Sequence, residues 1–245
     1  MISVCMATHN GEKYIKEQLD SIICQLSEED EIIISDDGSS DGTIRIVESY
    51  KDERIHLVHY NQPTESSHSH AYVCRNFENA LKKAKGDYIF LSDQDDWWMP
   101  NKVKKCLEDL ENNILVVHQI EMCDGELESK GIYKYIDKDR FKYKNYLSLN
   151  GGKYYGCAIA FRKELMLYIL PFPKKLMLHD QWIGCLAELI GTVYYEREPL
   201  IKYRVHGGNT SIGVSKNHFL FQVWYRVYMY VCLFLRKFQR IIQKK

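Results

Sequence analysis

A chain of 245 residues with 45% hydrophobic and 27% charged residues has the composition of a globular protein and is long enough for one substantial α/β domain. The 33 basic and 33 acidic side chains cancel, so we expect no nucleic-acid partner. The 8 cysteines include no Cys-x-x-Cys pair, which favours reduced thiols over a disulfide framework or a zinc site. The apolar start of the chain lacks a basic segment and predicts a first strand rather than a signal peptide, so we expect a cytoplasmic protein.

Apolar runs and amphipathic stretches alternate along the first 91 residues. Residues with helical spacing lie between four compact apolar runs, as is typical of strands joined by helices. The strands are expected over residues 2–7, 31–35, 55–60 and 88–91. This β-α-β-α-β-α-β order predicts an open, mostly parallel, Rossmann-like sheet with right-handed crossovers and helices on both faces.

The alternation continues beyond residue 100. A helix, a strand, a polar excursion, another strand, a helix that opens near Asp180 and two short strands are expected in that order. The expected strands lie over residues 114–117, 156–162, 193–195 and 200–203. Pro100 is expected in the first turn of the first of these helices, where its fixed φ and missing N–H are tolerated.

Three aspartates, Asp93, Asp95 and Asp96, follow the fourth expected strand within four residues. In an open α/β sheet, ligands bind in the crevice beyond the carboxyl ends of the strands. Clustered carboxylates repel each other and need a counter-charge; hard oxygen ligands suit Mg²⁺ or Mn²⁺, and these metals suit a diphosphate. The alternative is that Asp95 or Asp96 caps the next helix and that the other residues form a solvated turn.

Polar loops also follow the first two expected strands. They are Thr8-His9-Asn10 and Asp36-Asp37-Gly38-Ser39. Because the carboxyl ends of parallel strands share one edge, we expect both loops to meet the aspartates in one crevice, where an acidic side chain can accept hydrogen bonds from a nucleotide. The alternative for the second loop is an Asx turn that leads into a helix. No dinucleotide-binding glycine motif follows the first strand and no P-loop motif occurs, which argues against a dinucleotide oxidoreductase and a P-loop nucleotidase.

Five motifs stand in the order seen in bacterial family 2 glycosyltransferases, and the chain resembles that family over residues 2–212. They are Ser3-Val4-Cys5-Met6-Ala7-Thr8-His9-Asn10, Asp36-Asp37-Gly38-Ser39-Ser40-Asp41-Gly42-Thr43, Leu91-Ser92-Asp93-Gln94-Asp95-Asp96, His179-Asp180 and Tyr203-Arg204-Val205-His206-Gly207. The resemblance implies a GT-A fold and an inverting mechanism. In detail the chain is similar to the branch that includes rhamnosyltransferases and galactosyltransferases of surface-polysaccharide assembly.

The resemblance assigns five residues to the nucleotide-sugar donor. Asp37 would contact the nucleotide base, and Arg75 and Asn76 match a family Arg-Asn pair that lies near the nucleotide. Thr8 and Asn10, in the first of the five motifs, are expected to line the same donor site.

Other matched residues concern the metal and the reaction. Asp93 and Asp95 match the D-x-D-D element that holds the metal and the donor diphosphate, with Asp95 as the direct ligand. Asp180 stands where the family has its general base, and the alternative is a helix N-cap. His206 is expected to contact the metal or a phosphate, with a structural histidine as the alternative, and Arg204 is expected to face the donor phosphates.

Two groups of residues leave alternatives open. His68 and His70 lie in a polar loop where many relatives have a short glycine turn, and solvated side chains are favoured over metal ligands. Trp97, Trp98 and Trp182 either stack on sugar faces or fill the core, and core packing is favoured for at least one of the tandem pair.

Together these assignments predict a metal-dependent, inverting glycosyltransferase. Its donor would be a UDP- or dTDP-sugar, such as rhamnose or galactose, and its acceptor a hydroxyl of a lipid-linked glycan. Such a transfer needs a carboxylate that takes the hydroxyl proton and a divalent metal, Mg²⁺ or Mn²⁺, that neutralises the leaving diphosphate. The alternative is a catalytically silent, membrane-tethered module that binds nucleotide sugars or acts as a scaffold. A nucleotidyltransferase would need a phosphate loop rich in glycine and Lys/Arg after the first strand, which this chain does not match.

We expect two parts in the chain. Residues 1–212 would form the catalytic domain, with a nucleotide-binding half over 1–100 and an acceptor half over 101–212. Residues 213–245 would form an aromatic and basic helical segment outside that domain.

The C-terminal segment is nearly all apolar or aromatic from His218 to Leu235, and basic residues follow it. A spanning helix needs about 20 apolar residues, and the internal Arg226 is costly in a bilayer. We therefore expect a helix that lies on the anionic cytosolic leaflet and places the protein peripherally on the inner face of the plasma membrane. The alternatives are a helix docked on the catalytic domain and a helix at the interface of a homodimer.

Overall fold

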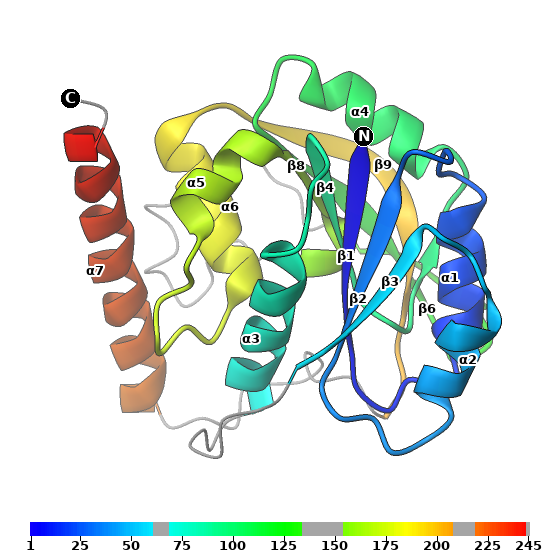
Figure 1. Ribbon diagram of the computed structural model, residues 1–245. Helices are drawn as coiled ribbons and strands as arrows, with labels where there is room; N and C mark the ends of the chain where they lie inside the picture. The colour runs from blue at the N-terminus through cyan, green and yellow to red at the C-terminus, as the bar shows by residue number, and fades with distance from the viewer. Residues whose placement is uncertain (61–68, 134–153, 208–218, 244–245) are drawn as a thin grey trace.

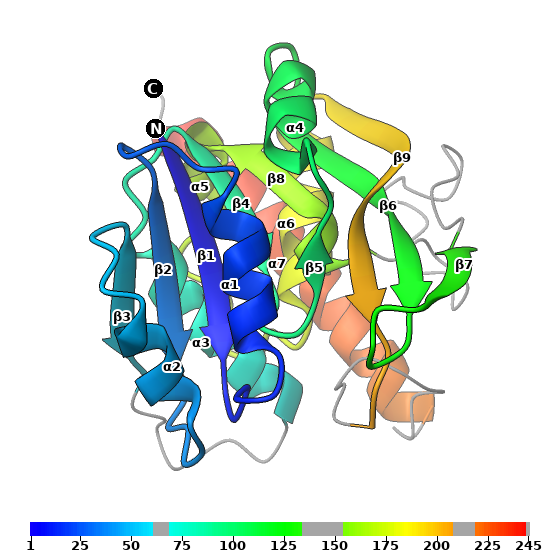
Figure 2. The same cartoon turned by 90° about the vertical axis from the view of Figure 1, so that its right-hand side faces the viewer.

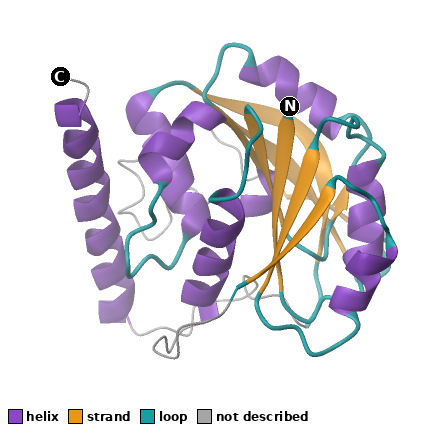
Figure 3. Cartoon of the chain, viewed as in Figure 1, coloured by secondary structure: helices purple, strands orange, loops and turns teal. Residues whose placement is uncertain are grey.

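The computed structural model describes residues 1–60, 69–133, 154–207 and 219–243. Within these ranges one twisted sheet runs through the domain (Figure 1), and Figure 3 shows helices on both sides of the strands. The strands are β1 (Ile2–Thr8), β2 (Glu31–Asp36), β3 (Ile55–His59), β4 (Tyr88–Ser92), β5 (Trp97–Trp98), β6 (Leu115–Cys123), β7 (Ser129–Tyr133), β8 (Ile159–Arg162) and β9 (Val193–Arg204).

The strand order among the described residues is β3-β2-β1-β4-β8-β6-β9-β5, with β7 paired to β6. The strands β1 to β4 are parallel, as the alternation predicts. By contrast, β8 is antiparallel to both β4 and β6, and β5 is antiparallel to β9. The open, Rossmann-like sheet is confirmed. Its second half mixes strand directions. Sequence periodicity detects the helical crossovers that join parallel strands, and antiparallel pairs need no such crossover, so the alternation does not reveal them.

The helices form layers on the two faces of the sheet. They are α1 (Ile15–Ile23), α2 (Thr43–Ser49), α3 (Ser69–Leu81), α4 (Lys102–Leu110), α5 (Met166–Ile169), α6 (His179–Ile190) and α7 (Phe219–Gln243). Short 3₁₀ turns lie at Gly156–Ala158 and Lys163–Leu165. Helices α1, α2 and α4 cover one face and α3, α5 and α6 the other, while α7 lies outside α5 and α6 (Figure 1, Figure 2).

The core follows from the apolar pattern. The whole of β2 is buried, as expected for a strand covered on both faces. Helix α1 buries Ile15, Leu19 and Ile22, which lie on one face at helical spacing. Burial of each such side chain stabilises the fold by about 1.5–3 kcal/mol.

Boundaries differ from expectation around the acidic loop. Trp97 and Trp98 form a short strand on β9, and α4 begins at Lys102, so Pro100 lies ahead of the helix and not in its first turn. The two short strands expected near residue 200 are one strand, β9, with irregular register. Trp98 is buried while Trp97 is partly exposed, which confirms core packing for one of the pair.

The C-terminal helix docks on the catalytic domain through one face. Met229 and Leu233 are buried, and α7 contacts both α5 and α6. The docking alternative is therefore confirmed for this face. Among the described helices, none combines the length and the hydropathy that a membrane crossing requires. His68 lies outside the described residues, as does the side chain of His70.

Candidate active site

Three loops meet at the carboxyl ends of β1, β2 and β4. The Thr8 hydroxyl donates to Asp36 Oδ1 at 3.1 Å, which ties the ends of β1 and β2. The Gln94 side chain brackets the backbone of His9: Oε1 accepts from the His9 amide at 2.9 Å, and Nε2 donates to the His9 carbonyl at 3.0 Å. The predicted convergence of these loops on one edge is thus present in the structure.

Asp36 and Asp37, which lie at the end of β2, make different contacts. Asp36 holds the turn, because its carboxylate also accepts from the Ser39 amide at 2.8 Å, three residues on, whereas an Asx turn would use the amide two residues on. Gly38 follows with φ +70°, a left-handed conformation that suits glycine. Asp37 lies at the edge itself: its amide donates to the Thr8 carbonyl at 3.0 Å, and its side chain is nearly buried. Its contact with a nucleotide base stays a prediction.

Asn10 and Asn76 both support the loop after β1. Asn10 has φ +49°, and its Oδ1 accepts from the Ser40 amide at 2.8 Å across the crevice edge. Asn76 is buried and donates through Nδ2 to the Thr8 carbonyl at 3.1 Å. These bonds fix the backbone that a donor nucleotide would meet.

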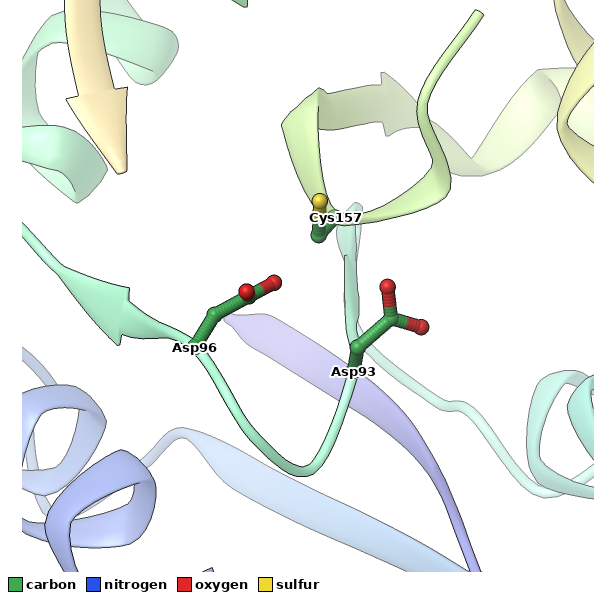
Figure 4. A group of neighbouring side chains, drawn as sticks. All are labelled: Asp93, Asp96 and Cys157. Atoms are coloured by element: carbon green, nitrogen blue, oxygen red, sulfur yellow. The ribbon is translucent and has the colours of Figure 1, made fainter. Parts of the chain in front are cut away.

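The acidic loop after β4 turns two carboxylates inward. Ligand atoms of Asp93, Asp96 and Cys157 all lie within 4.8 Å of one another (Figure 4). Asp96 is fully buried, and its Oδ1 accepts from the Arg204 amide at 3.0 Å. Cys157 comes from the 3₁₀ turn before β8, and the sequence reasoning missed it because nothing near it in the chain signals a contact with the aspartates.

A buried cation supplies the counter-charge that the carboxylates need. Lys102, at the start of α4, is fully buried and donates to the Cys157 carbonyl at 2.7 Å. Its ammonium also lies 4.2 Å from the centroid of the Trp98 ring, a cation–π contact. The acidic cluster indicates that some cation must be near, but sequence alone does not identify Lys102.

Burial shifts the protonation of this cluster. Desolvation, helped by the charges of Asp95 and Asp180, raises the pKa of Asp93 to about 7. Desolvation also raises the pKa of Asp96 well above its usual range and lowers the pKa of Lys102 to about 8. Burial therefore favours the protonated forms of both aspartates, and a bound cation would favour their ionised forms.

Asp95 and His206 form the pair best suited to a divalent metal. His206 Nε2 lies 2.9 Å from Asp95 Oδ2, and both side chains are partly exposed. The His206 ring packs on Tyr14, with 4.8 Å between ring centroids, so the imidazole is oriented by the fold. A carboxylate and an imidazole suit Mn²⁺ well, and carboxylates also suit Mg²⁺. The residues present therefore fit the predicted metal.

Arg204 braces the acidic loop. It is buried in β9; its Nε donates to the Asp95 carbonyl at 2.9 Å, and Nη2 donates to Glu17 Oε2 at 2.7 Å. Nη1 donates to the Gly125 carbonyl. The guanidinium is thus directed at protein acceptors, because burial requires its N–H groups to be satisfied. Its expected contact with donor phosphates stays a prediction that this geometry does not favour.

Arg75 is likewise directed at protein groups. Its guanidinium pairs with Glu78 at 2.5 Å on the same helix, and Nη2 donates to the Pro173 carbonyl at 2.6 Å. The segment that contains Pro173 leads to α6. Proximity of Arg75 to the nucleotide stays a prediction.

Asp180 lies in the first turn of α6. The N-cap residue of this helix is Leu178, which has no side-chain cap bond, so the N-cap alternative for Asp180 is wrong. Its Oδ1 accepts from the Gln181 amide at 2.7 Å. Its charge contributes to the raised pKa of Asp93, so the two carboxylates are within electrostatic reach. The role of Asp180 as the general base stays a prediction.

Comparison with known proteins shows the family and the fold. The chain is 29% identical over 222 residues to the dTDP-rhamnosyl transferase RfbG of Shigella flexneri, covering 86% of this chain and 74% of that protein. Its structure is similar to S. aureus TarS 1-349 in complex with UDP-GlcNAc, with TM-score 0.68 and 19% identity, over 93% of this chain and 66% of that chain. It is also similar to glucosyl-3-phosphoglycerate synthase from Mycobacterium tuberculosis in complex with Mn²⁺, UDP and glucosyl-3-phosphoglycerate, with TM-score 0.55 and 18% identity, over 96% of this chain and 79% of that chain.

These likenesses establish the fold as GT-A. Two of the curated relatives are covered over only 66% of their own length. The sequence model described as "Glycosyl transferase family 2" matches residues 3–169, which is more than half of the chain. The chain belongs to glycosyl transferase family 2.

Proposed function

We propose that the chain transfers a sugar, with inversion, from a UDP- or dTDP-sugar to a hydroxyl of a lipid-linked glycan in surface-polysaccharide synthesis. The observation that carries this proposal is the Asp95–His206 pair, 2.9 Å apart, together with the charge of Asp180, which helps to raise the pKa of the neighbouring Asp93. An inverting transfer needs groups that can hold a metal and a separate acid that can act as the base. RfbG, a dTDP-rhamnosyl transferase by description, and TarS, which binds UDP-GlcNAc, support a nucleotide-sugar donor.

The chemistry is a single displacement at the anomeric carbon. Asp180 takes the proton from the attacking hydroxyl, a contribution of about 10²–10⁴-fold. Asp95 and His206, with Asp93 as the third predicted ligand, would hold Mg²⁺ or Mn²⁺, which when bound would supply Lewis-acid neutralisation of the charge on the leaving diphosphate. Arg204 keeps the acidic loop in place, and Lys102 balances its buried charge.

A thermal-shift panel of nucleoside diphosphates and nucleotide sugars, with and without Mn²⁺, tests the donor and the metal. We expect one nucleotide series to raise the Tm, and to do so only when Mn²⁺ is present. A panel in which no nucleotide shifts the Tm would refute the proposal, and a metal-independent shift would remove the metal from it. Binding without release of the nucleoside diphosphate in the presence of acceptor glycans would favour the catalytically silent module.

We further propose that the outer face of α7 lies on an anionic membrane surface, where a lipid-linked acceptor is found. Large apolar side chains on that helix are exposed: Val223, Trp224, Val227, Val231, Phe234, Leu235 and Phe238. An exposed apolar patch of this kind marks an interaction site. Residues 213–245 carry seven Lys and Arg and no Asp or Glu, which complements anionic lipid and would repel a second copy of the same helix.

Flotation with vesicles tests this face of α7. We expect the protein to float with phosphatidylglycerol vesicles and not with phosphatidylcholine vesicles, and Val231→Glu to abolish flotation. If Val231→Glu floats like the wild type, the outer face is not the membrane contact. A dimer that Val231→Glu converts to a monomer, without flotation of either form, would assign the face to self-association instead.

A further inference from the structure

The segment that leads to the predicted base makes few backbone hydrogen bonds of its own, such as the one from the Leu176 amide to the Pro173 carbonyl at 3.0 Å. Helix α5 ends at Ile169 because Leu170 is extended, with φ −96° and ψ +147°, as suits a residue before proline. The last carbonyls of a helix have no intrahelical partner. Pro171 and Pro173 then lack N–H groups, so no regular pairing continues. Acceptors in this stretch must find donors elsewhere.

Arginine from the C-terminal helix supplies one set of donors. Arg236 Nη1 donates to the carbonyls of Tyr168 at 2.7 Å and Leu170 at 2.9 Å, and Nη2 donates to the carbonyl of Pro171 at 2.6 Å. A cation at a helix C-terminus is electrostatically favourable, since the carbonyl ends carry partial negative charge. The carbonyl of Ile169, the last residue of α5, accepts from the indole Nε1 of Trp182 on α6 at 2.9 Å.

Helix α3 supplies the other set. Arg75 donates to the carbonyls of Phe172 at 3.4 Å and Pro173 at 2.6 Å, while Glu78 Oε1 accepts from the Phe172 amide at 3.1 Å. Six consecutive carbonyls, from residue 168 to residue 173, therefore accept side-chain hydrogen bonds from α3, α6 and α7. Arg75 on α3 and Arg236 on α7 therefore bind the same segment from two different helices.

We propose that Arg75 and Arg236 are positioning residues that hold the start of α6, and with it the Asp180 carboxylate, in place for the acceptor. The inference rests on the proposed function, because it assumes that Asp180 is the base. The segment of residues 168–173 ends six residues before α6 begins. Trp182, two residues after Asp180, is hydrogen-bonded to the same segment. The C-terminal helix then contributes to turnover, beyond any role in membrane contact.

Kinetics of glutamine variants test the positioning role. The probes are the nucleoside diphosphate with Mn²⁺ for binding, and the nucleotide sugar selected by the thermal-shift panel for turnover, with water as acceptor. For Arg75→Gln and Arg236→Gln we expect kcat to fall about tenfold or more while the Kd of the nucleoside diphosphate stays within about twofold. Arg197→Gln, at an exposed position on β9, makes the same chemical change and should leave both constants unaltered. Arg236→Lys should recover part of kcat, because an ammonium can reach some of the same carbonyls.

Hydrogen exchange gives a readout that does not depend on turnover. We expect both glutamine variants to speed amide exchange across residues 171–183 and to leave β1 to β4 unchanged. Unaltered exchange over 171–183, or unaltered kcat with normal binding, overturns the inference. A loss of nucleotide affinity in Arg75→Gln without loss of kcat also overturns it and makes Arg75 a donor contact. If the wild type binds and turns over no nucleotide sugar, the proposed function fails, and the exchange result alone then decides whether the arginines hold α6.

Discussion

Replacing Asp180 with asparagine removes a charge and a proton acceptor while keeping the shape of the side chain. The Oδ1 atom that accepts from the Gln181 amide at 2.7 Å remains in asparagine, so the first turn of α6 keeps this hydrogen bond. A general base contributes about 10²–10⁴-fold to the rate. That factor corresponds to about 2.7–5.5 kcal/mol of activation free energy. We expect kcat for sugar transfer to fall by about 10²–10⁴-fold.

Donor binding should survive the same change. Asp180 contributes a negative charge that raises the pKa of Asp93, so its removal favours the ionised form of Asp93 and does not weaken a cation site. Calorimetry with nucleoside diphosphate and Mn²⁺ measures binding, and release of the diphosphate measures turnover. Asp87→Asn changes an exposed carboxylate at the opposite end of β4 and is the matched control. If Asp180→Asn keeps kcat within about threefold of the wild type, Asp180 is not the base.

Three further predictions concern the metal, the pH dependence and the C-terminal helix. Asp95→Ala or His206→Ala should weaken Mn²⁺-dependent binding of the nucleoside diphosphate about tenfold or more, measured by calorimetry; unchanged affinity would remove the pair as ligands. Because burial raises the folded-state pKa of Asp93 to about 7, this group stabilises the metal-free fold at low pH and that stability is lost as the pH rises through 7. The metal-free Tm should therefore fall as the pH rises from acidic values to about 7, and Asp93→Asn should make this decline smaller. Leu233→Ala, on the buried face of α7, should lower the free energy of unfolding by about 2–5 kcal/mol in urea titrations; a loss below about 1 kcal/mol would mean that α7 is loosely docked.

The first half of the fold is predictable because its signals are local. Short β-branched runs such as Ile32-Ile33-Ile34 favour buried strands, and the helices between them carry clear amphipathic spacing. Parallel topology then places Thr8, Asp36 and the acidic loop at one edge, as the hydrogen bonds between them show. Asp95 and His206 were expected as metal ligands from the family resemblance, and the structure places their side chains 2.9 Å apart.

The charged residues inside the protein were not predictable in this way. Lys102 occupies the start of an amphipathic helix, a position that usually faces solvent, yet it is fully buried beside the carboxylates. Arg204 was expected to face the donor phosphates and Arg75 to lie near the nucleotide, whereas in the structure their donors are directed at carbonyls and carboxylates brought close by tertiary packing. No local pattern reports which acceptors a long side chain will reach.

Charge balance links these buried groups to the order of binding. Burial favours the protonated forms of Asp93 and Asp96, and it lowers the pKa of the neighbouring Lys102 to about 8. A donor diphosphate that bound here alone would add negative charge near Asp95 and Asp180. A divalent cation that bound first, or together with the donor, would favour the ionised aspartates and offset the charge of the diphosphate. We therefore predict weak nucleotide affinity in the absence of a divalent cation, which calorimetry with and without Mn²⁺ would measure.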